Sequence, residues 1–170
     1  MAVTPVCVFV GAPAAGKTTI GQAVAEALNV EFRDTDADIV AAAGKEIPDI
    51  FVDDGEDVFR AFERAAVSVA LESFAGVLAL GSGAILDPET REQLATHTVV
   101  YLTVELTDAI SRVGMGSSRP LLRMNPRATL KYLMDQRRPL YEQVATLTIA
   151  TDGRDPKEIA AGIVEALPPR

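Results

Sequence analysis

The chain has 170 residues, 48% of them hydrophobic, and its 16 basic and 24 acidic side chains give a net charge of −8. Such a length and apolar fraction fit one globular domain, which we expect to span residues 1–170. The acidic balance argues against nucleic acid as a partner, because phosphate backbones are bound by basic faces. No apolar stretch reaches the roughly 18 residues of a membrane helix. The first basic residue, Lys17, comes too late for a signal peptide. We expect a cytoplasmic protein that does not bind membranes.

Charge is unevenly distributed along the chain. Residues 112–138 carry seven basic side chains and one acidic side chain, a net charge of +6, which leaves −14 for the rest. A basic segment on an acidic protein indicates a small polyanion bound locally, although a solvated helix face is the alternative. The single cysteine, Cys7, excludes a disulfide framework and lies in an apolar run, where we expect it to be buried.

The first half of the chain alternates between strand and helix patterns. The apolar run at 6–10 predicts a buried parallel strand, and residues 17–28 predict a helix with an apolar face. A short strand is expected near 30–32. Residues 57–74 then show apolar side chains at helical spacing, which predicts a long helix.

The second half repeats the alternation. In chain order we expect a strand ending in a glycine turn at 77–86, a capped helix at 87–94, a strand at 99–104, a capped helix at 125–144, a strand at 147–151 and a capped helix at 155–167. Alternating strands and helices predict an α/β fold, a parallel sheet with helices on both faces. Residues 114–126 combine Gly, Ser and Pro with basic side chains, which suits a mobile lid.

Residues 11–19, "GAPAAGKTT", contain the pattern G-x-x-x-x-G-K-[ST] between the first strand and the first helix. In such a loop, backbone N–H groups and the helix N-terminus cradle phosphates. Lys17 would bind the β- and γ-phosphates, and the Thr18 hydroxyl would coordinate Mg²⁺. The expected nucleotide contacts here are Ala14, Ala15, Gly16, Lys17, Thr18 and Thr19.

An acidic group for the metal must come from elsewhere, because the strand "VLAL" ends in Gly81 rather than aspartate. Asp34 and Asp36 follow the second strand, where parallel α/β folds place their sites. One carboxylate can serve the metal while the other faces an acceptor hydroxyl. The alternative for one of them is to cap the following helix. The "DxxG" and "NKxD" patterns of GTPases are absent, which favours ATP.

Two arginines indicate an acceptor that carries a carboxylate. Arg60 has Glu63 three residues on, near enough to orient its guanidinium, and Arg137 lies in "RRPLY". A guanidinium fork grips planar oxyanions. For either arginine alone, a surface salt bridge is the alternative.

Taken together, the motifs resemble the shikimate kinase family along nearly the whole chain. "GAPAAGKTT", "DTD" (34–36), "FRAFE" (59–63), "GSGA" (81–84), "RPLL" (119–122) and "RRPLY" (137–141) occur in the family's order and spacing. The resemblance implies transfer of the ATP γ-phosphate to the 3-hydroxyl of shikimate, in aromatic amino acid synthesis. It also implies a P-loop NTPase-type three-layer α/β/α fold with five parallel strands in the order 2-3-1-4-5. Members of the family are typically monomers.

The resemblance also implies roles for individual residues. On the nucleotide side, Lys17 and Thr18 would meet the phosphates and Mg²⁺, with Asp34 near the metal. Arg119 would be the lid arginine that reaches the transferred phosphate, and Arg112 and Arg154 would lie near the adenine. Catalysis would rest on Asp36, Lys17 and Arg119. The acceptor side would comprise Asp36 on the shikimate hydroxyls as candidate base, Arg60 and Arg137 on the carboxylate, Phe51 and Phe59 along the ring, and Gly81, Ser82 and Gly83 by backbone approach.

The chain departs from the family pattern at two positions where glycine is usual. Ala14 lies in the phosphate loop, and alanine is unfavourable there only if its φ is positive. Ser82 lies between two glycines, and we expect its side chain to point away from the pocket if its φ is negative. Two other functions stay open: a related kinase of another hydroxy acid such as gluconate, and a nucleotide-binding regulatory protein that transfers nothing.

Overall fold

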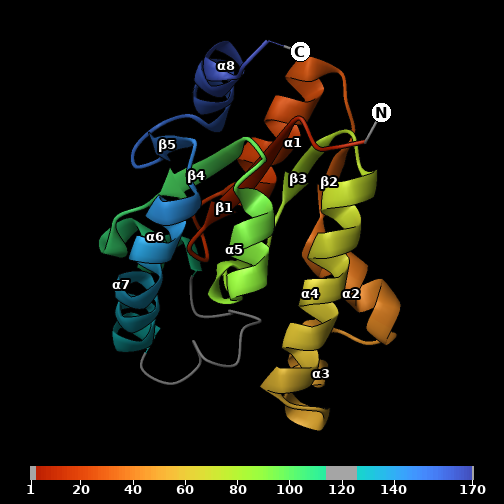
Figure 1. Cartoon of the computed structure of the whole chain (residues 1–170). Helices are drawn as coiled ribbons and strands as arrows, with labels where there is room; N and C mark the ends of the chain where they lie inside the picture. The colour runs from red at the N-terminus through yellow and green to blue at the C-terminus, as the bar shows by residue number, and fades with distance from the viewer. Residues whose placement is uncertain (1–2, 114–125, 170) are drawn as a thin grey trace.

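The computed structural model describes residues 3–113 and 126–169 of the chain (Figure 1). Five parallel strands form one sheet in the order β2-β3-β1-β4-β5, which confirms the expected topology. The strands are β1 (Cys7–Gly11), β2 (Phe32–Asp34), β3 (Val77–Ala79), β4 (Val99–Thr103) and β5 (Leu147–Ala150).

Strand β1 lies at the centre of the sheet because it pairs with β3 on one side and β4 on the other. Val8 is in register with Leu78 of β3 and with Val99 of β4. All five residues of β1 are buried, since helices cover both faces of the sheet. This burial explains why the strand is an unbroken apolar run rather than an alternating one.

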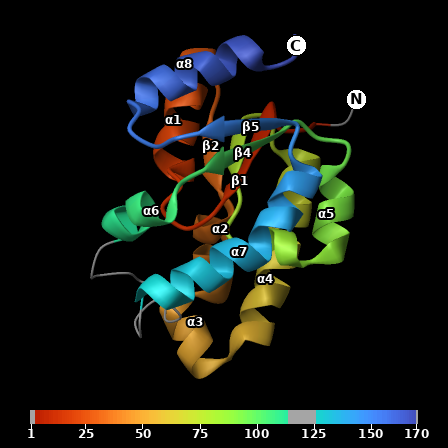
Figure 2. The ribbon, with the colours of Figure 1, turned by 90° about the vertical axis from the view of Figure 1, so that its left-hand side faces the viewer.

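Helices on both faces complete the three layers (Figure 2). Helices α1 (Lys17–Leu28) and α8 (Pro156–Ala166) pack together on one face. Helices α4 (Glu56–Ser73) and α5 (Pro88–Leu94) and the C-terminal end of α7 (Pro126–Val144) cover the other face. As expected, Asp87 caps α5, by accepting a hydrogen bond from the Thr90 N–H, and Asp155 caps α8, by accepting from the Lys157 N–H.

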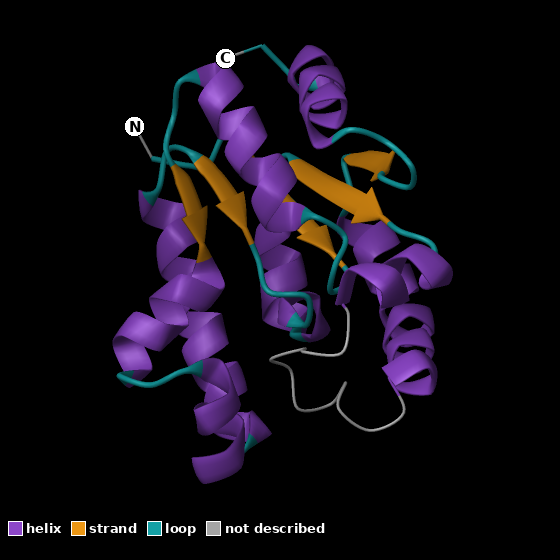
Figure 3. Ribbon diagram, turned by 180° about the vertical axis from the view of Figure 1, so that it is seen from behind, coloured by secondary structure: helices purple, strands orange, loops and turns teal. Residues whose placement is uncertain are grey.

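Three further helices were not assigned from the sequence: α2 (Thr35–Ala43), α3 (Ile47–Asp53) and α6 (Leu106–Val113). Each is short, with at most nine residues, which gives few turns over which a helical spacing of apolar residues can be recognised. A separate small core joins α2, α3 and α4 through Ile39, Ile50 and Phe59. Figures 1 and 3 show that α3 and the N-terminal part of α4 extend beyond the carboxyl ends of the strands.

Two strands differ from the prediction by more than one residue, while the other three agree to within one residue at each end. Strand β2 begins at Phe32 rather than at 30, and the predicted strand at 77–86 stops at Ala79. Residues Ala84–Leu86 form a 3₁₀ turn instead. The expected lid, residues 114–126, lies almost entirely outside the described residues. Among the described residues, no helix combines the length and apolarity needed to cross a membrane.

Candidate active site

The phosphate loop, residues 11–16, connects the end of β1 to the start of α1. The Ala15 N–H donates to the Ala12 carbonyl at 3.1 Å, and the Gly16 carbonyl accepts from the Ile20 N–H at 2.8 Å. The Lys17 ammonium folds back over the loop and donates to the carbonyl oxygens of Gly11 and Ala12, at 2.8 and 3.0 Å. A cation and a helix N-terminus thus converge at one turn, which is the arrangement that binds phosphate groups.

Ala14 adopts a left-handed backbone conformation, with φ of 69°. Its carbonyl accepts a hydrogen bond from Arg112 Nη1 at 3.1 Å, and the same guanidinium binds the hydroxyl and the carbonyl of Thr151. Arg154 lies beside this contact, since its Nη1 donates to the Ala150 carbonyl at 2.9 Å. The two arginines expected near the adenine therefore bind neighbouring residues at the end of β5, and Arg112 also contacts the phosphate loop.

Asp34 ends β2 and caps α2, because its Oδ1 accepts from the Asp36 N–H at 2.9 Å. Its other oxygen, Oδ2, accepts from the Thr18 hydroxyl at 3.3 Å. Burial raises the pKa of Asp34 above its usual range, and the charge of Asp36 adds to this, while the two hydrogen bonds and Lys17 oppose it. The two residues expected to serve a metal are thus adjacent, and both offer oxygen ligands.

Residues 81–83 form a turn shortly after β3. Each glycine of this turn lies against one or more charged side chains. A Cβ at Gly81 would lie 2.8 Å from Asp36 Oδ1 and 3.0 Å from Glu63 Oε2. A Cβ at Gly83 would collide with the Arg60 guanidinium. The glycines are therefore needed for close approach, and they bring the acidic and basic groups of the site to one place.

Arg60 is held in a fixed orientation at this turn. Its Nη1 donates to Glu63 Oε1 at 2.8 Å and its Nε to Glu56 Oε2 at 3.3 Å. Glu63 is buried, so the first of these ion pairs is shielded from water. The guanidinium also lies over the Phe59 ring, which packs against Phe51 with ring centroids 4.8 Å apart. Phe59 is itself part of the small core of α2, α3 and α4.

Ser82, in the middle of the turn, is bound by two residues of α7. Arg137 Nη1 donates to Ser82 Oγ at 3.3 Å, and the Tyr141 hydroxyl donates to the Ser82 carbonyl at 2.5 Å. Ser82 is not among the residues with positive φ, so serine is unstrained here. Arg137 is only 5% exposed, and Tyr141 is buried and stacks on Tyr101.

Two structural partners were not recognised from the sequence. Tyr141 lies four residues after Arg137, hence on the same face of α7, and this spacing in "RRPLY" was the available signal. Thr151, which holds Arg112, gave no local signal. Arg119, the expected lid arginine, lies outside the described residues.

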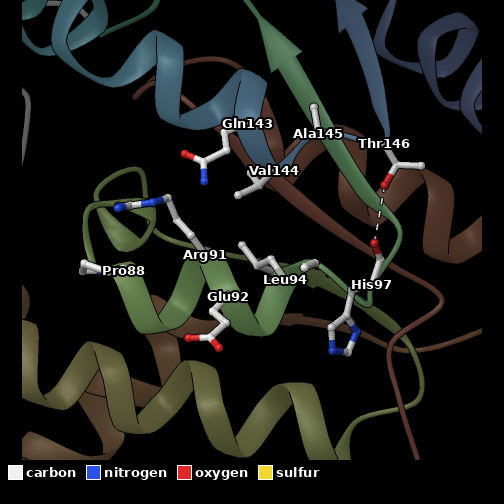
Figure 4. Close-up of a pocket in the computed structure, with 10 residues that line it drawn as sticks. Pro88, Arg91, Glu92, Leu94, His97, Gln143, Val144, Ala145 and Thr146 are labelled. Carbon is white, nitrogen blue, oxygen red and sulfur yellow. Dashed lines mark hydrogen bonds between the residues drawn. The ribbon is translucent and has the colours of Figure 1, made fainter.

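A separate hollow of about 700 Å³ lies elsewhere, between α5, the C-terminal end of α7 and the start of β5 (Figure 4). His97 and Thr146, which line it, precede β4 and β5. It therefore opens at the amino ends of the strands, whereas the phosphate loop and the 81–83 turn follow their carboxyl ends. This hollow is not part of the site described above.

The fold and the site together define a P-loop phosphotransferase: a phosphate loop follows the central strand of a parallel sheet, and a cluster of acidic and basic side chains lies at the turn that follows the neighbouring strand. The family model for shikimate kinase matches residues 13–168. A shikimate kinase from Salinispora tropica is 62% identical over 164 residues, covering 96% of this chain and 98% of the relative. The solved shikimate kinase from Acinetobacter baumannii, in complex with shikimate, superposes with a TM-score of 0.90 at 36% identity, covering 96% of this chain and 92% of that chain.

The chain belongs to the shikimate kinase family, which confirms the expected family and the expected enzyme class. A gluconokinase from Sinorhizobium meliloti 1021 shares the fold alone, with a TM-score of 0.59 at 19% identity over 95% of this chain and 90% of that chain. The gluconate alternative therefore has no support beyond the shared architecture.

Proposed function

We propose that the protein transfers the γ-phosphate of ATP to the 3-hydroxyl of shikimate, giving shikimate 3-phosphate and ADP. The observation that carries this is the 81–83 turn, where two guanidinium groups and two carboxylates meet at consecutive residues. This arrangement fits a small acid that carries hydroxyl groups. The guanidinium groups can bind the carboxylate of the acid, and a carboxylate of the protein can accept a proton from one of its hydroxyl groups. The family membership supports the same substrates.

At the acceptor end, Arg60 and Arg137 would hold the shikimate carboxylate. Arg60 is oriented by Glu63 and Phe59, and Arg137 by its contact with the turn. A planar fork fixed in this way grips a carboxylate with two parallel hydrogen bonds, which orients the ring as well as binding it. Phe51 and Phe59 would flank the ring.

Asp36 would act as the base, since its carboxylate lies at Gly81, and its N–H binds Asp34, which in turn contacts Thr18 at the end of the phosphate loop. As the 3-hydroxyl oxygen forms its bond to the γ-phosphorus, the bond from that phosphorus to the ADP oxygen breaks, and the hydroxyl proton passes to Asp36. Lys17 would offset the negative charge on the transferred group. This role requires the Lys17 ammonium to exchange its loop carbonyls for phosphate oxygens.

The residues present fit Mg²⁺. This ion prefers oxygen ligands, and it is commonly bound through one or two protein groups together with phosphates and water. Thr18 Oγ1 and Asp34 Oδ2 lie 3.3 Å apart, close to the roughly 3 Å between neighbouring ligands of an octahedral Mg²⁺. The described residues contain no cluster of three or more His, Cys, Asp or Glu side chains suited to a metal. Most ligands would therefore come from the nucleotide and water, and the ion would neutralise phosphate charge.

The test is an ADP-release assay with a panel of hydroxy acids. We expect millimolar shikimate to stimulate ADP formation, gluconate to leave it unchanged, and EDTA to abolish it. A response to gluconate alone would favour the other kinase. Tight ATP binding with no stimulated release by any acid would favour a regulatory nucleotide-binding protein. The monomeric state and the cytoplasmic location stay predictions, the first of which light scattering would test.

A further inference from the structure

Ser82 places a hydroxyl group in the middle of the 81–83 turn. Its side chain does not point away from the site, as the sequence led us to expect, but toward Arg137. The residue is 1% exposed, and the contact from Arg137 Nη1 to its Oγ is buried. A buried hydroxyl facing a buried guanidinium is in a position to limit how that guanidinium can rotate.

The backbone of Ser82 is fixed by the same helix. The Tyr141 hydroxyl donates to the Ser82 carbonyl, and Tyr141 lies one turn of α7 beyond Arg137. The Tyr141 ring in turn stacks on Tyr101 of the central sheet, with centroids 5.0 Å apart. The Ser82 Oγ is therefore a fixed acceptor, because the turn that carries it is anchored to α7 and, through Tyr141, to β4.

We infer that Ser82 is a positioning residue for acceptor binding, whose hydroxyl holds the Arg137 guanidinium in the orientation that receives the carboxylate of the acid. The inference rests on the function proposed above. A long arginine side chain loses considerable rotational freedom when it binds a ligand, and a contact that restricts it beforehand reduces that loss. The carboxylate is bound in the ground state and the transition state alike, so the effect belongs to binding rather than to the chemical step.

The primary test is Ser82→Ala, which removes the hydroxyl and keeps the Cβ. We expect KM for shikimate to rise about three- to tenfold. A rise of this size corresponds to losing one hydrogen bond to a charged group, when the distance from donor to acceptor is long for a hydrogen bond. The value of kcat and KM for ATP should stay within about twofold of wild type. Ser82→Gly should likewise raise KM for shikimate while leaving kcat and KM for ATP nearly unchanged. It serves as the second variant if Ser82→Ala fails to fold. Thermal-shift titration with shikimate would give the same ratio of dissociation constants without turnover.

A double-mutant cycle with Arg137 separates positioning from a merely structural role. If Ser82 acts through the guanidinium fork, Ser82→Ala should change KM for shikimate by less than about 1.5-fold in an Arg137→Lys background. Additive effects of the two substitutions, or equal losses in kcat and in the affinity for both substrates, would overturn the inference. A wild-type protein that shows no shikimate-dependent ADP release would instead overturn the proposed function. Normal wild-type activity with an unchanged Ser82→Ala variant would overturn only the role of Ser82.

Discussion

Arg112 donates a hydrogen bond to the carbonyl oxygen of Ala14, 98 positions earlier in the chain, at 3.1 Å. This contact joins the middle of the phosphate loop to the end of β5, because the same guanidinium also binds Thr151. It occurs at a residue whose φ of 69° is unfavourable for alanine. The strained residue of the phosphate loop is thus also the one that a distant element contacts.

Ala14→Gly should therefore stabilise the protein. Glycine removes the strain of a left-handed backbone conformation, about 1–2 kcal/mol. Part of this gain is offset because glycine raises the conformational entropy of the unfolded chain. We expect a net increase of about 0.5–1 kcal/mol in the free energy of unfolding, or about 1–4 °C in Tm. Ala161→Gly, at an exposed position inside α8, is the matched control and should lower stability by about 1 kcal/mol. Destabilisation by both substitutions would show that residue 14 is not strained.

Lys17→Ala should reduce kcat at least about a hundredfold while the fold stays intact. The lysine is the cation of the phosphate loop, and electrostatic contacts to a transferred phosphoryl group are worth on the order of 3 kcal/mol or more. Steady-state kinetics and circular dichroism would check the two halves of this prediction. The control variant Lys157→Ala, at an exposed position on α8, should keep the kcat of the wild type. A Lys17→Ala variant within tenfold of wild type would place the reacting nucleotide elsewhere.

Arg137→Lys should weaken shikimate binding more than ATP binding. Lysine keeps the charge but loses the two-pronged grip, and a charge-assisted hydrogen bond is worth about 1.5–3 kcal/mol. We expect KM for shikimate to rise roughly tenfold or more, with KM for ATP little changed. The neighbouring Arg138, whose side chain is 54% exposed, supplies the control Arg138→Lys. A rise in KM for ATP alone would assign Arg137 to the nucleotide side.

Cys7 should be unreactive in the folded protein. Its side chain is fully buried in β1, and burial raises the pKa of the thiol to about 12. Because the thiolate is the reactive form, Ellman's reagent at pH 8 should label Cys7 only after unfolding. The stability that comes from keeping the thiol protonated is complete below the unfolded pKa of 9.0 and is lost as the pH rises toward 12. Cys7→Val should therefore lose less stability over that window, and rapid labelling of native protein would contradict the buried position.

Local signals in the sequence were sufficient for most of the fold. The run of buried residues in β1, the phosphate loop and the caps at Asp87 and Asp155 are all set by neighbouring residues, and each was predicted. The orientation of Arg60 by Glu63 was also predicted, because residues three apart share a helix face. The alternative that one of the two aspartates caps the following helix is confirmed at Asp34, which accepts a hydrogen bond from the Asp36 N–H.

The remaining features depend on contacts between distant segments. The Tyr141 hydroxyl meets a carbonyl 59 residues away, and no pattern around either residue specifies that pairing. The conformation of Ala14 and the direction of the Ser82 side chain likewise depend on packing against other elements. Single-residue departures from a family pattern are therefore hard to interpret from sequence, because their consequences lie in neighbours that the sequence does not identify.

Most of the residues that we propose bind the acceptor lie in one continuous stretch of chain. Asp36, Arg60 and the 81–83 turn all lie between β2 and the 3₁₀ turn at Ala84–Leu86, whereas Arg137 comes from α7, beyond β4. A graft of residues 32–86 from another kinase with this architecture would exchange nearly the whole acceptor pocket while leaving the nucleotide loop untouched. The bonds from Arg137 and Tyr141 to Ser82, and from Thr18 to Asp34, would cross the boundaries of such a chimera, so residues 34 and 82 of the donor must be compatible with these partners in the recipient.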